Sequence, residues 1–204
     1  KNSVSYFNRE LALPNYVFKG KQLATFTEIT YNKYKEKNDW VFGSNLRTEN
    51  FKENPVANLD RSYQQITFGG FSQHNWNIKE DFTLESGLRL DVNNNYGLFV
   101  LPRISMFYQF NEKVSSRFGF GYGYKIPSIF TEESELRAYQ NVSPIQSENF
   151  KAETSIGFNA DINYKTSIFN DAISVSFNQL FFFTKLKNSL LLNQQGNDFV
   201  FENS

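Results

Sequence analysis

The chain has 204 residues, with 21 Lys and Arg residues against 21 Asp and Glu residues, one histidine and no cysteine. The balanced charge predicts no basic surface for nucleic acid, and the lack of cysteine excludes disulfides, thiol catalysis and thiolate metal ligands. The single histidine, His74, excludes a metal site built from several histidines. Aromatic residues are plentiful (23 Phe and 11 Tyr), yet the mean hydropathy is -0.51. This combination is typical of strands that are apolar on one face only.

Alternation of apolar and polar residues predicts long strands along the whole chain. The expected strands comprise residues 3–11, 21–34, 40–51, 62–76, 82–92, 98–110, 114–124, 150–164 and 171–185, with a last apolar run at 199–201. The links expected to be short comprise 35–39, 77–81, 111–113 and 165–169. The links expected to be mostly longer comprise 12–20, 52–61, 125–147 and 186–197, with the short link 93–97 as the exception on that side.

The predicted strand 82–92 illustrates the two faces. Its apolar side chains are expected on one face: Phe82, Leu84, Leu88, Leu90 and Val92. Glu85, Arg89 and Asp91 alternate with them and are expected on the other face. Strand 114–124 repeats the pattern, with an expected apolar side made of Val114, Ser116, Phe118, Phe120, Tyr122 and Tyr124.

The strand lengths and the sorting of the links favour a membrane protein. Strands that cross a bilayer need about 9–11 residues, and barrel strands are joined by short turns on one side and longer loops on the other. Both Trp residues, Trp40 and Trp76, flank short links, as the aromatic girdle of such a barrel requires. No run of about twenty apolar residues is present, so no transmembrane helix is expected. The predicted fold is all-β: an antiparallel up-and-down meander that forms a section of a transmembrane β-barrel.

About nine strands are expected, whereas single-chain bacterial barrels have even numbers and must close. Lys1 opens directly into a strand-like pattern, and the chain ends in Glu-Asn-Ser after Phe201. We therefore expect the chain to be a fragment of a larger barrel.

Four stretches carry a recognisable combination of motifs: FTLESGLRLD (82–91), LFVLPRISMFYQFNE (98–112), SRFGFGYGYKIPSIF (116–130) and NVSPIQSENFKAETSIGF (141–158). Together they resemble the strand signatures of TonB-dependent outer-membrane receptors. The stretch FTEESELRAYQNVSPI (130–145) is similar to Bacteroidetes-type members in particular. The likeness runs from about residue 40 to residue 185, and its specificity lies in the combination of the motifs.

The resemblance implies a Gram-negative outer-membrane barrel of about 22 strands, filled by an N-terminal plug domain. Residues 1–204 would be a partial barrel domain without the plug. The implied partners are outer-membrane lipid, the receptor's own plug domain and remaining strands, the TonB complex and an imported small ligand, with no nucleic acid. The implied function is uptake of a scarce nutrient: a ferric siderophore, haem, cobalamin or a glycan. No cofactor, metal or enzymatic activity is expected, since no nucleophile–base pair, carboxylate dyad or phosphate loop is present.

The long link 125–147 would lie outside the cell, and binding residues concentrate on loops held by a rigid scaffold. The candidate ligand-binding residues are Tyr124, Lys125, Phe130, Arg137 and Tyr139. For each of them, packing within the loop is the competing interpretation. Thr131 is expected to cap a short helix. A solvated loop surface is favoured over a metal site for Glu132, Glu133 and Glu135.

A second set of charged residues is expected to face the lumen and the plug. It comprises Glu85, Arg89, Asp91, Arg103, Arg117, Lys151 and Glu153. Ion pairs within the wall or to the plug are favoured over direct contact with the ligand, and Arg103 is expected diagonally opposite Glu85. A solvated or lumenal position is expected for His74.

Two other classes of protein stay open. The first is a non-transporting outer-membrane barrel or adhesin. The second is a soluble β-sandwich that binds glycans, in which the apolar faces would pack against a second sheet. Residues that would then be covered are Phe82, Leu84, Leu88, Phe118, Phe120, Phe158 and Phe177.

Overall fold

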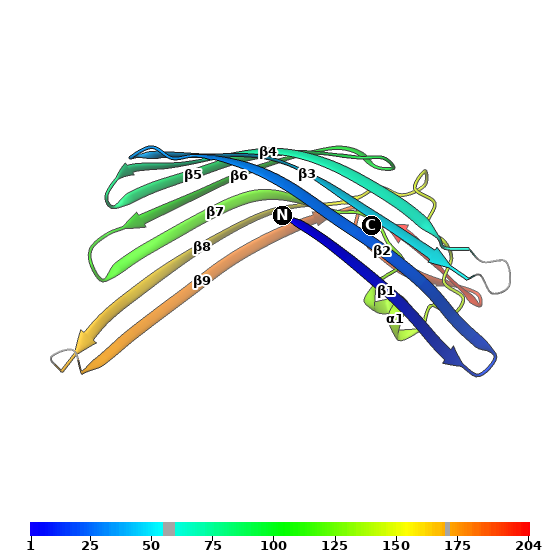
Figure 1. Cartoon of the computed structure of the whole chain (residues 1–204). Coiled ribbons are helices and arrows are strands. Elements are labelled where there is room, and N and C mark those ends of the chain that lie inside the picture. Colours follow the sequence, from blue (N-terminus) through cyan, green and yellow to red (C-terminus); the bar gives the residue numbers. More distant parts are fainter. Residues whose placement is uncertain (55–59, 170–171) are drawn as a thin grey trace.

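A computed structural model of the chain describes residues 1–54, 60–169 and 172–204. The strands of the main sheet are β1 (Asn2–Leu13), β2 (Tyr16–Lys33), β3 (Asn38–Glu53), β4 (Tyr63–Lys79), β5 (Phe82–Asn93), β6 (Gly97–Gln109), β7 (Val114–Lys125), β8 (Glu153–Ile168) and β9 (Ile173–Lys187). The remaining elements are α1 (Glu132–Leu136), β10 (Leu190–Gln195) and β11 (Asp198–Asn203). Each of the nine long strands pairs antiparallel with its neighbour in sequence, and the sheet bends into an open curve (Figure 1). The predicted all-β meander is therefore confirmed.

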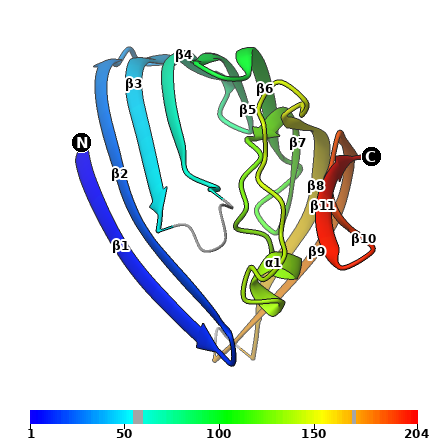
Figure 2. The same cartoon turned by 90° about the vertical axis from the view of Figure 1, so that its right-hand side faces the viewer.

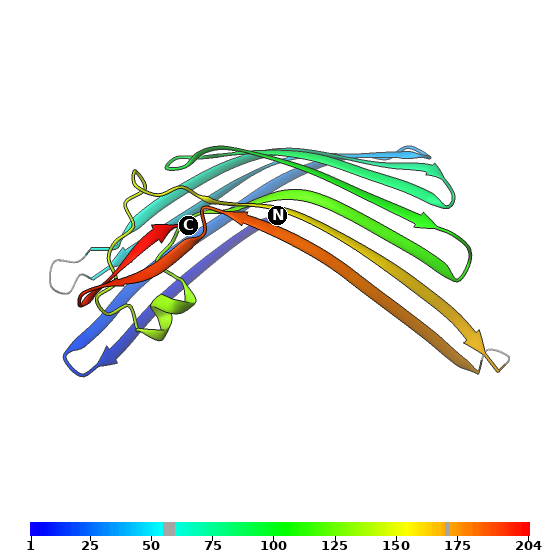
Figure 3. The same cartoon turned by 180° about the vertical axis from the view of Figure 1, so that it is seen from behind.

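The two faces of the sheet differ as the alternation predicts. The convex face carries exposed apolar side chains, among them Leu88, Phe118, Phe158 and Phe177, which are 37–57% exposed. In the described part of the chain the only other sheet is the β10–β11 hairpin, which lies with α1 at one end of the curve (Figure 3). No second sheet covers the convex face there, so the soluble β-sandwich interpretation is wrong. Among the same residues, no helix is long and apolar enough to cross a membrane.

Several links were predicted at the wrong residues, because some residues that commonly form turns lie within strands in the structure. β1 and β2 are joined by a turn at Pro14 and Asn15, whose φ of 66° is left-handed, and the predicted link 12–20 lies largely within these two strands. Gly20 is not a turn residue: a Cβ there would lie 2.5 Å from the ring of Phe51, so the position needs a glycine for packing.

Three boundaries differ near the C-terminal part of the sheet. The predicted turn 165–169 is mostly strand, because β8 continues to Ile168, which pairs with Ile173. The predicted strand start at Phe150 is also wrong, since β8 begins at Glu153. The predicted polar link 186–197 contains β10, which pairs with β11. Residues 55–59 of the predicted link 52–61 and Asp171 of the predicted strand 171–185 lie outside the described residues.

Residues 126–152, which we call the roof loop, fold back over the concave face instead of extending away from the sheet (Figure 2). A small buried core holds them there. Phe18 and Phe51 come from the curved main sheet β1–β9, which we call the wall. Ile129, Tyr139 and Val142 come from the roof loop, and Phe201 comes from β11. The core is extended by a bridge between Val142 and Phe199. Thr131 caps α1 as predicted, and its Oγ1 accepts a hydrogen bond from the Ser134 amide at 3.2 Å. The main core of the chain therefore lies between the roof loop and one end of the wall.

Candidate ligand-binding site

Arg61 joins the wall to the roof loop. Its guanidinium forms a buried ion pair with Glu53, and both side chains are 3% exposed. The same guanidinium donates to the main-chain carbonyls of Tyr139 and Val142 and, at 3.1 Å, to the hydroxyl of Tyr16. Burial is the largest single effect and acts to lower the pKa of Arg61, but the hydrogen bonds and charge interactions with Glu53 and Tyr16 together outweigh it, so the pKa is raised. Arg61 therefore stays charged and fixes the roof loop at two carbonyl groups.

Further contacts hold the same segment. Tyr16 donates its hydroxyl to the Tyr139 carbonyl at 2.9 Å. The Tyr139 ring stacks on Phe18 with centroids 4.4 Å apart, and burial raises the pKa of its phenol. At the edge of the segment, Arg9 pairs with Glu135. These contacts make the roof loop a fixed part of the structure.

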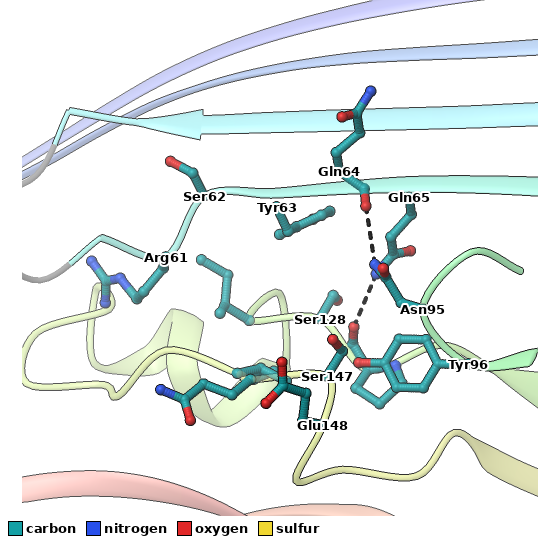
Figure 4. Close-up of a pocket in the computed structure, with 14 residues that line it drawn as sticks. Arg61, Ser62, Tyr63, Gln64, Gln65, Asn95, Tyr96, Ser128, Ser147 and Glu148 are labelled. Atoms are coloured by element: carbon teal, nitrogen blue, oxygen red, sulfur yellow. Dashed lines mark hydrogen bonds between the residues drawn. The ribbon is translucent and has the colours of Figure 1, made fainter.

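Between the roof loop and the ends of β4, β5 and β6 lies a hollow of about 530 Å³, which we call the mouth pocket (Figure 4). It is lined by Arg61, Ser62, Tyr63, Gln64, Gln65, Asn95, Tyr96, Pro127, Ser128, Ile129, Ile145, Gln146, Ser147 and Glu148. Pockets for small molecules commonly occupy about 300–1,000 Å³, so its volume suits such a ligand. Its polar lining is mostly hydroxyl and amide groups.

Two hydrogen bonds orient the amides of the mouth pocket. Gln65 donates its Nε2 to the Pro127 carbonyl at 3.3 Å, and Asn95 donates its Nδ2 to the Gln64 carbonyl at 3.0 Å. The Gln64 side chain points away from the pocket (Figure 4). Burial raises the pKa of Tyr96, which keeps its phenol protonated.

A second hollow of about 490 Å³, which we call the inner pocket, shares Gln65 and Ser128 with the mouth pocket. It is lined by Arg47, Glu49, Gln65, Thr67, Arg89, Asp91, Leu101, Gly123, Tyr124, Lys125, Ile126 and Ser128. Asp91, 1% exposed, accepts from Arg89 Nε at 2.7 Å and from the Tyr124 hydroxyl at 2.8 Å. Arg89 also donates to Asn45 Oδ1 at 3.2 Å. The floor of the inner pocket is thus a connected ionic network on the concave face.

The predicted ligand-binding residues divide into two groups. Tyr124 and Lys125 come together in the inner pocket. Phe130 packs edge-on against Phe51 at 5.0 Å, Tyr139 is buried, and the Arg137 guanidinium lies 4.1 Å from the Phe199 ring centroid. These three side chains pack against β2, β3 and β11 and help to hold the roof loop, and ligand contact by any of the five stays a prediction.

Tyr124 does not lie on the apolar face where the alternation predicts it. Its ring stacks on Phe99 at 3.9 Å, and its hydroxyl reaches Asp91. The pairing of β7 with β6 ends at Gly121, and beyond that residue β7 pairs with β8 alone.

The predicted lumen-facing residues are partly paired within the wall. Arg103 forms the expected diagonal ion pair with Glu85, and Arg89 pairs with Asp91. The Arg117 guanidinium lies over the Phe107 ring at 5.6 Å. Glu153 begins β8 and lines a small hollow together with Lys125.

Lys151 precedes β8, and its backbone is held by Asn203 of β11. It therefore does not lie on the strand where the sequence placed it. Contact of the lumen-facing residues with a plug remains a prediction.

His74 pairs with Ser86 and so lies on the convex face with Leu84 and Leu88, which makes the lumenal position wrong, while a solvated position stays a prediction. Its ring stacks on Trp40 at 4.2 Å, and its Nε2 lies 2.8 Å from Asn38 Oδ1. Of the acidic loop residues, Glu132 and Glu133 are exposed, while Glu135 pairs with Arg9. Within the described ranges, no group of three or more His, Cys, Asp or Glu residues could hold a metal ion.

Sequence reasoning missed Arg61, Asn95, Tyr96 and Ser147. They lie on separate links, and the contacts that unite them depend on the folding of the roof loop. The opposite charges of Glu53 and Arg61, on either side of one link, were the one signal available.

The curved meander, its apolar convex face and its roofed polar pockets define a section of an outer-membrane receptor barrel. The family described as TonB dependent receptor-like, beta-barrel matches residues 2–204, and the chain belongs to this family. Its members are transporters of the Gram-negative outer membrane and not enzymes. The predicted family and outer-membrane location are confirmed, while the Bacteroidetes assignment stays a prediction.

Solved structures of this family share the fold. The siderophore receptor PirA from Pseudomonas aeruginosa aligns with a TM-score of 0.73 and 16% identity, over 98% of this chain and 37% of that protein. The ferric enterobactin receptor PfeA from P. aeruginosa, in complex with BCV-L6, aligns with a TM-score of 0.68 and 16% identity, over 99% and 36%. The copper transporter OprC aligns with a TM-score of 0.67 and 12% identity, over 92% and 34%. The chain thus spans about a third of the length of these proteins. No curated protein sequence matches the chain.

Proposed function

We propose that this chain forms part of the wall and the outer roof of a receptor that imports a scarce nutrient across the outer membrane, driven by the TonB complex. One observation carries the proposal: the roof loop is fixed inside the curve of a family barrel wall and leaves polar pockets between itself and the wall. Loops held on a rigid scaffold are the usual place for ligand contacts.

The nutrient would be a ferric siderophore, haem, cobalamin or a glycan. The titles of the similar structures name a siderophore receptor, a ferric enterobactin receptor and a copper transporter, which supports import of a small ligand in general. At identities of 12–16% these proteins share the fold with this chain, and their ligands do not transfer to it.

The two pockets suggest an order of contacts with the ligand. We assign first contact with the ligand to the mouth pocket, and later contacts to Tyr124 and Lys125 in the inner pocket. The charged residues deeper on the concave face, including the Glu85–Arg103 pair, would contact the plug domain of the full receptor. Polar barrel interiors that hold a plug fit this arrangement.

Deleting the gene that carries this chain tests the proposal. The deletion strain should fail to grow when one of these nutrients is supplied as the sole source, and a plasmid copy should restore growth. A plasmid copy that lacks residues 126–152 is the control that shows whether the barrel assembles in the outer membrane without the roof loop. Normal growth of the deletion strain on every source, together with normal surface display of the protein from the plasmid copy, would favour the non-transporting barrel or adhesin.

A further inference from the structure

Among the residues that the structure describes, the lining of the mouth pocket offers no available cation. Arg61 is the one Lys or Arg side chain in it, and Glu53, Tyr16 and two carbonyl groups occupy the Arg61 guanidinium. Glu148 also lines the pocket, and its carboxylate forms no ion pair with any described residue. The available charge in the pocket is therefore negative.

The amides of the mouth pocket keep unused hydrogen-bonding groups. Gln65 and Asn95 each donate one N–H of the amide nitrogen to a main-chain carbonyl, which leaves the amide oxygen and one N–H of each side chain for a ligand. The hydroxyls of Tyr96, Ser128 and Ser147 make no side-chain hydrogen bond to another residue in the part of the chain that the structure describes. Hydroxyl groups both donate and accept hydrogen bonds.

This set of groups discriminates between classes of ligand. An anionic ligand would lose its hydration without gaining a cation, and it would be repelled by Glu148. A ligand rich in hydroxyl groups can donate to the amide and carboxylate oxygens and accept from the free hydroxyls. The Tyr96 ring adds an amphipathic aromatic side chain beside these polar groups.

We propose that the mouth pocket binds an uncharged, hydroxyl-rich ligand of the oligosaccharide class. This inference rests on the proposed receptor function and narrows its substrate. It also makes Arg61 a positioning residue, because the Arg61 guanidinium binds Glu53 and the roof loop and does not contact the ligand.

The full receptor that contains this chain can be purified and applied to an array of neutral and acidic oligosaccharides. Ferric tris-catecholate and ferric trihydroxamate chelates are added in parallel as probes, with binding followed by protein fluorescence. We expect neutral oligosaccharides to bind. Acidic oligosaccharides and the anionic tris-catecholate chelate should fail because of their charge, and the uncharged trihydroxamate chelate should fail because its metal-binding groups leave no hydroxyl group to donate to the pocket. Tyr96→Ala should weaken binding about tenfold or more, whereas Arg103→Gln, which alters a wall ion pair outside the pocket, should leave it unchanged.

A second variant separates binding from folding. Glu148→Lys supplies a cation to the same pocket and should let the receptor bind tetragalacturonic acid, which the unaltered receptor should reject. Failure of every neutral oligosaccharide to bind, or binding of acidic oligosaccharides or chelates that Tyr96→Ala weakens, would overturn the inference.

The growth experiment tests the receptor function separately from this inference. Uptake of a chelate without oligosaccharide binding would keep the function and remove this inference. Oligosaccharide binding without uptake of any nutrient would do the reverse.

Discussion

Replacing Arg61 with methionine should release the roof loop. The substitution removes the guanidinium that is paired with Glu53 and leaves that carboxylate buried without its partner. Losing one partner of a buried ion pair costs about 3–5 kcal/mol. The carbonyls of Tyr139 and Val142 lose their donor as well. Since 1.4 kcal/mol is a factor of ten, the ratio of docked to released loop should fall by about a hundredfold to a few thousandfold.

Cysteine labelling on intact cells measures this ratio. The chain has no cysteine of its own, and Val142 is fully buried, with 0% exposure. Val142→Cys should therefore resist a polyethylene glycol maleimide in the otherwise unaltered receptor and react rapidly when combined with Arg61→Met. Arg103→Met is the matched control, because it breaks an ion pair whose arginine is 63% exposed. Exposed pairs contribute about 0–1 kcal/mol, so that variant should stay protected.

A double substitution checks the reasoning. Glu53→Leu combined with Arg61→Met leaves no unpaired buried charge, so the cysteine should react more slowly than in Arg61→Met alone. Equal labelling rates in Arg61→Met and Arg103→Met would refute the claim that the buried pair holds the loop.

Three further predictions concern the network, the loop and the membrane face. Gly69→Val should destabilise the barrel by about 1–3 kcal/mol, because a Cβ there lies 2.3 Å from a buried carboxylate oxygen, whereas at Gly121 the nearest atom is 3.7 Å away and alanine should be tolerated. Heat modifiability on gels compares the two. Burial raises the pKa of Tyr139, so docking of the roof loop is complete below the ordinary tyrosine pKa of about 10 and is lost as the pH rises through the raised value. Labelling of the same buried cysteine should increase at that pH, and Tyr139→Phe should remove the dependence. Leu88→Arg should cost about 2–4 kcal/mol at the centre of the membrane face, and Ser105→Arg on the concave face much less; equal loss of assembled receptor in both would contradict the assigned faces.

Period-two alternation was enough to predict the wall. The expected strand 82–92 matches β5 within one residue, and 114–124 matches β7 equally well. The Glu85–Arg103 pair followed from the register of a single hairpin. These features depend on residues close in sequence, which a pattern can report.

The errors arose where distant residues decide the structure. Gly20 looks like a turn signal, yet the Phe51 ring on the neighbouring strand accounts for it. β10 is short and lies in a link that is polar overall, and it forms because β11 pairs with it and Val142 bridges to Phe199. The pockets could not be predicted from the sequence for the same reason, because the roof loop that forms them is held by Arg61, which binds carbonyl groups 78 and 81 residues away.

A nitroxide scan along β5 tests the central claim most directly, namely that one face of this sheet meets lipid and the other meets the ligand path. Spin labels would be placed one at a time at residues 86–90 of the full receptor in lipid bilayers. Labels at the even positions, which include Leu88 and Leu90, should collide with oxygen dissolved in the bilayer far more often than labels at the odd positions, which include Arg89. Uniform accessibility along the strand, or the opposite alternation, would contradict the account.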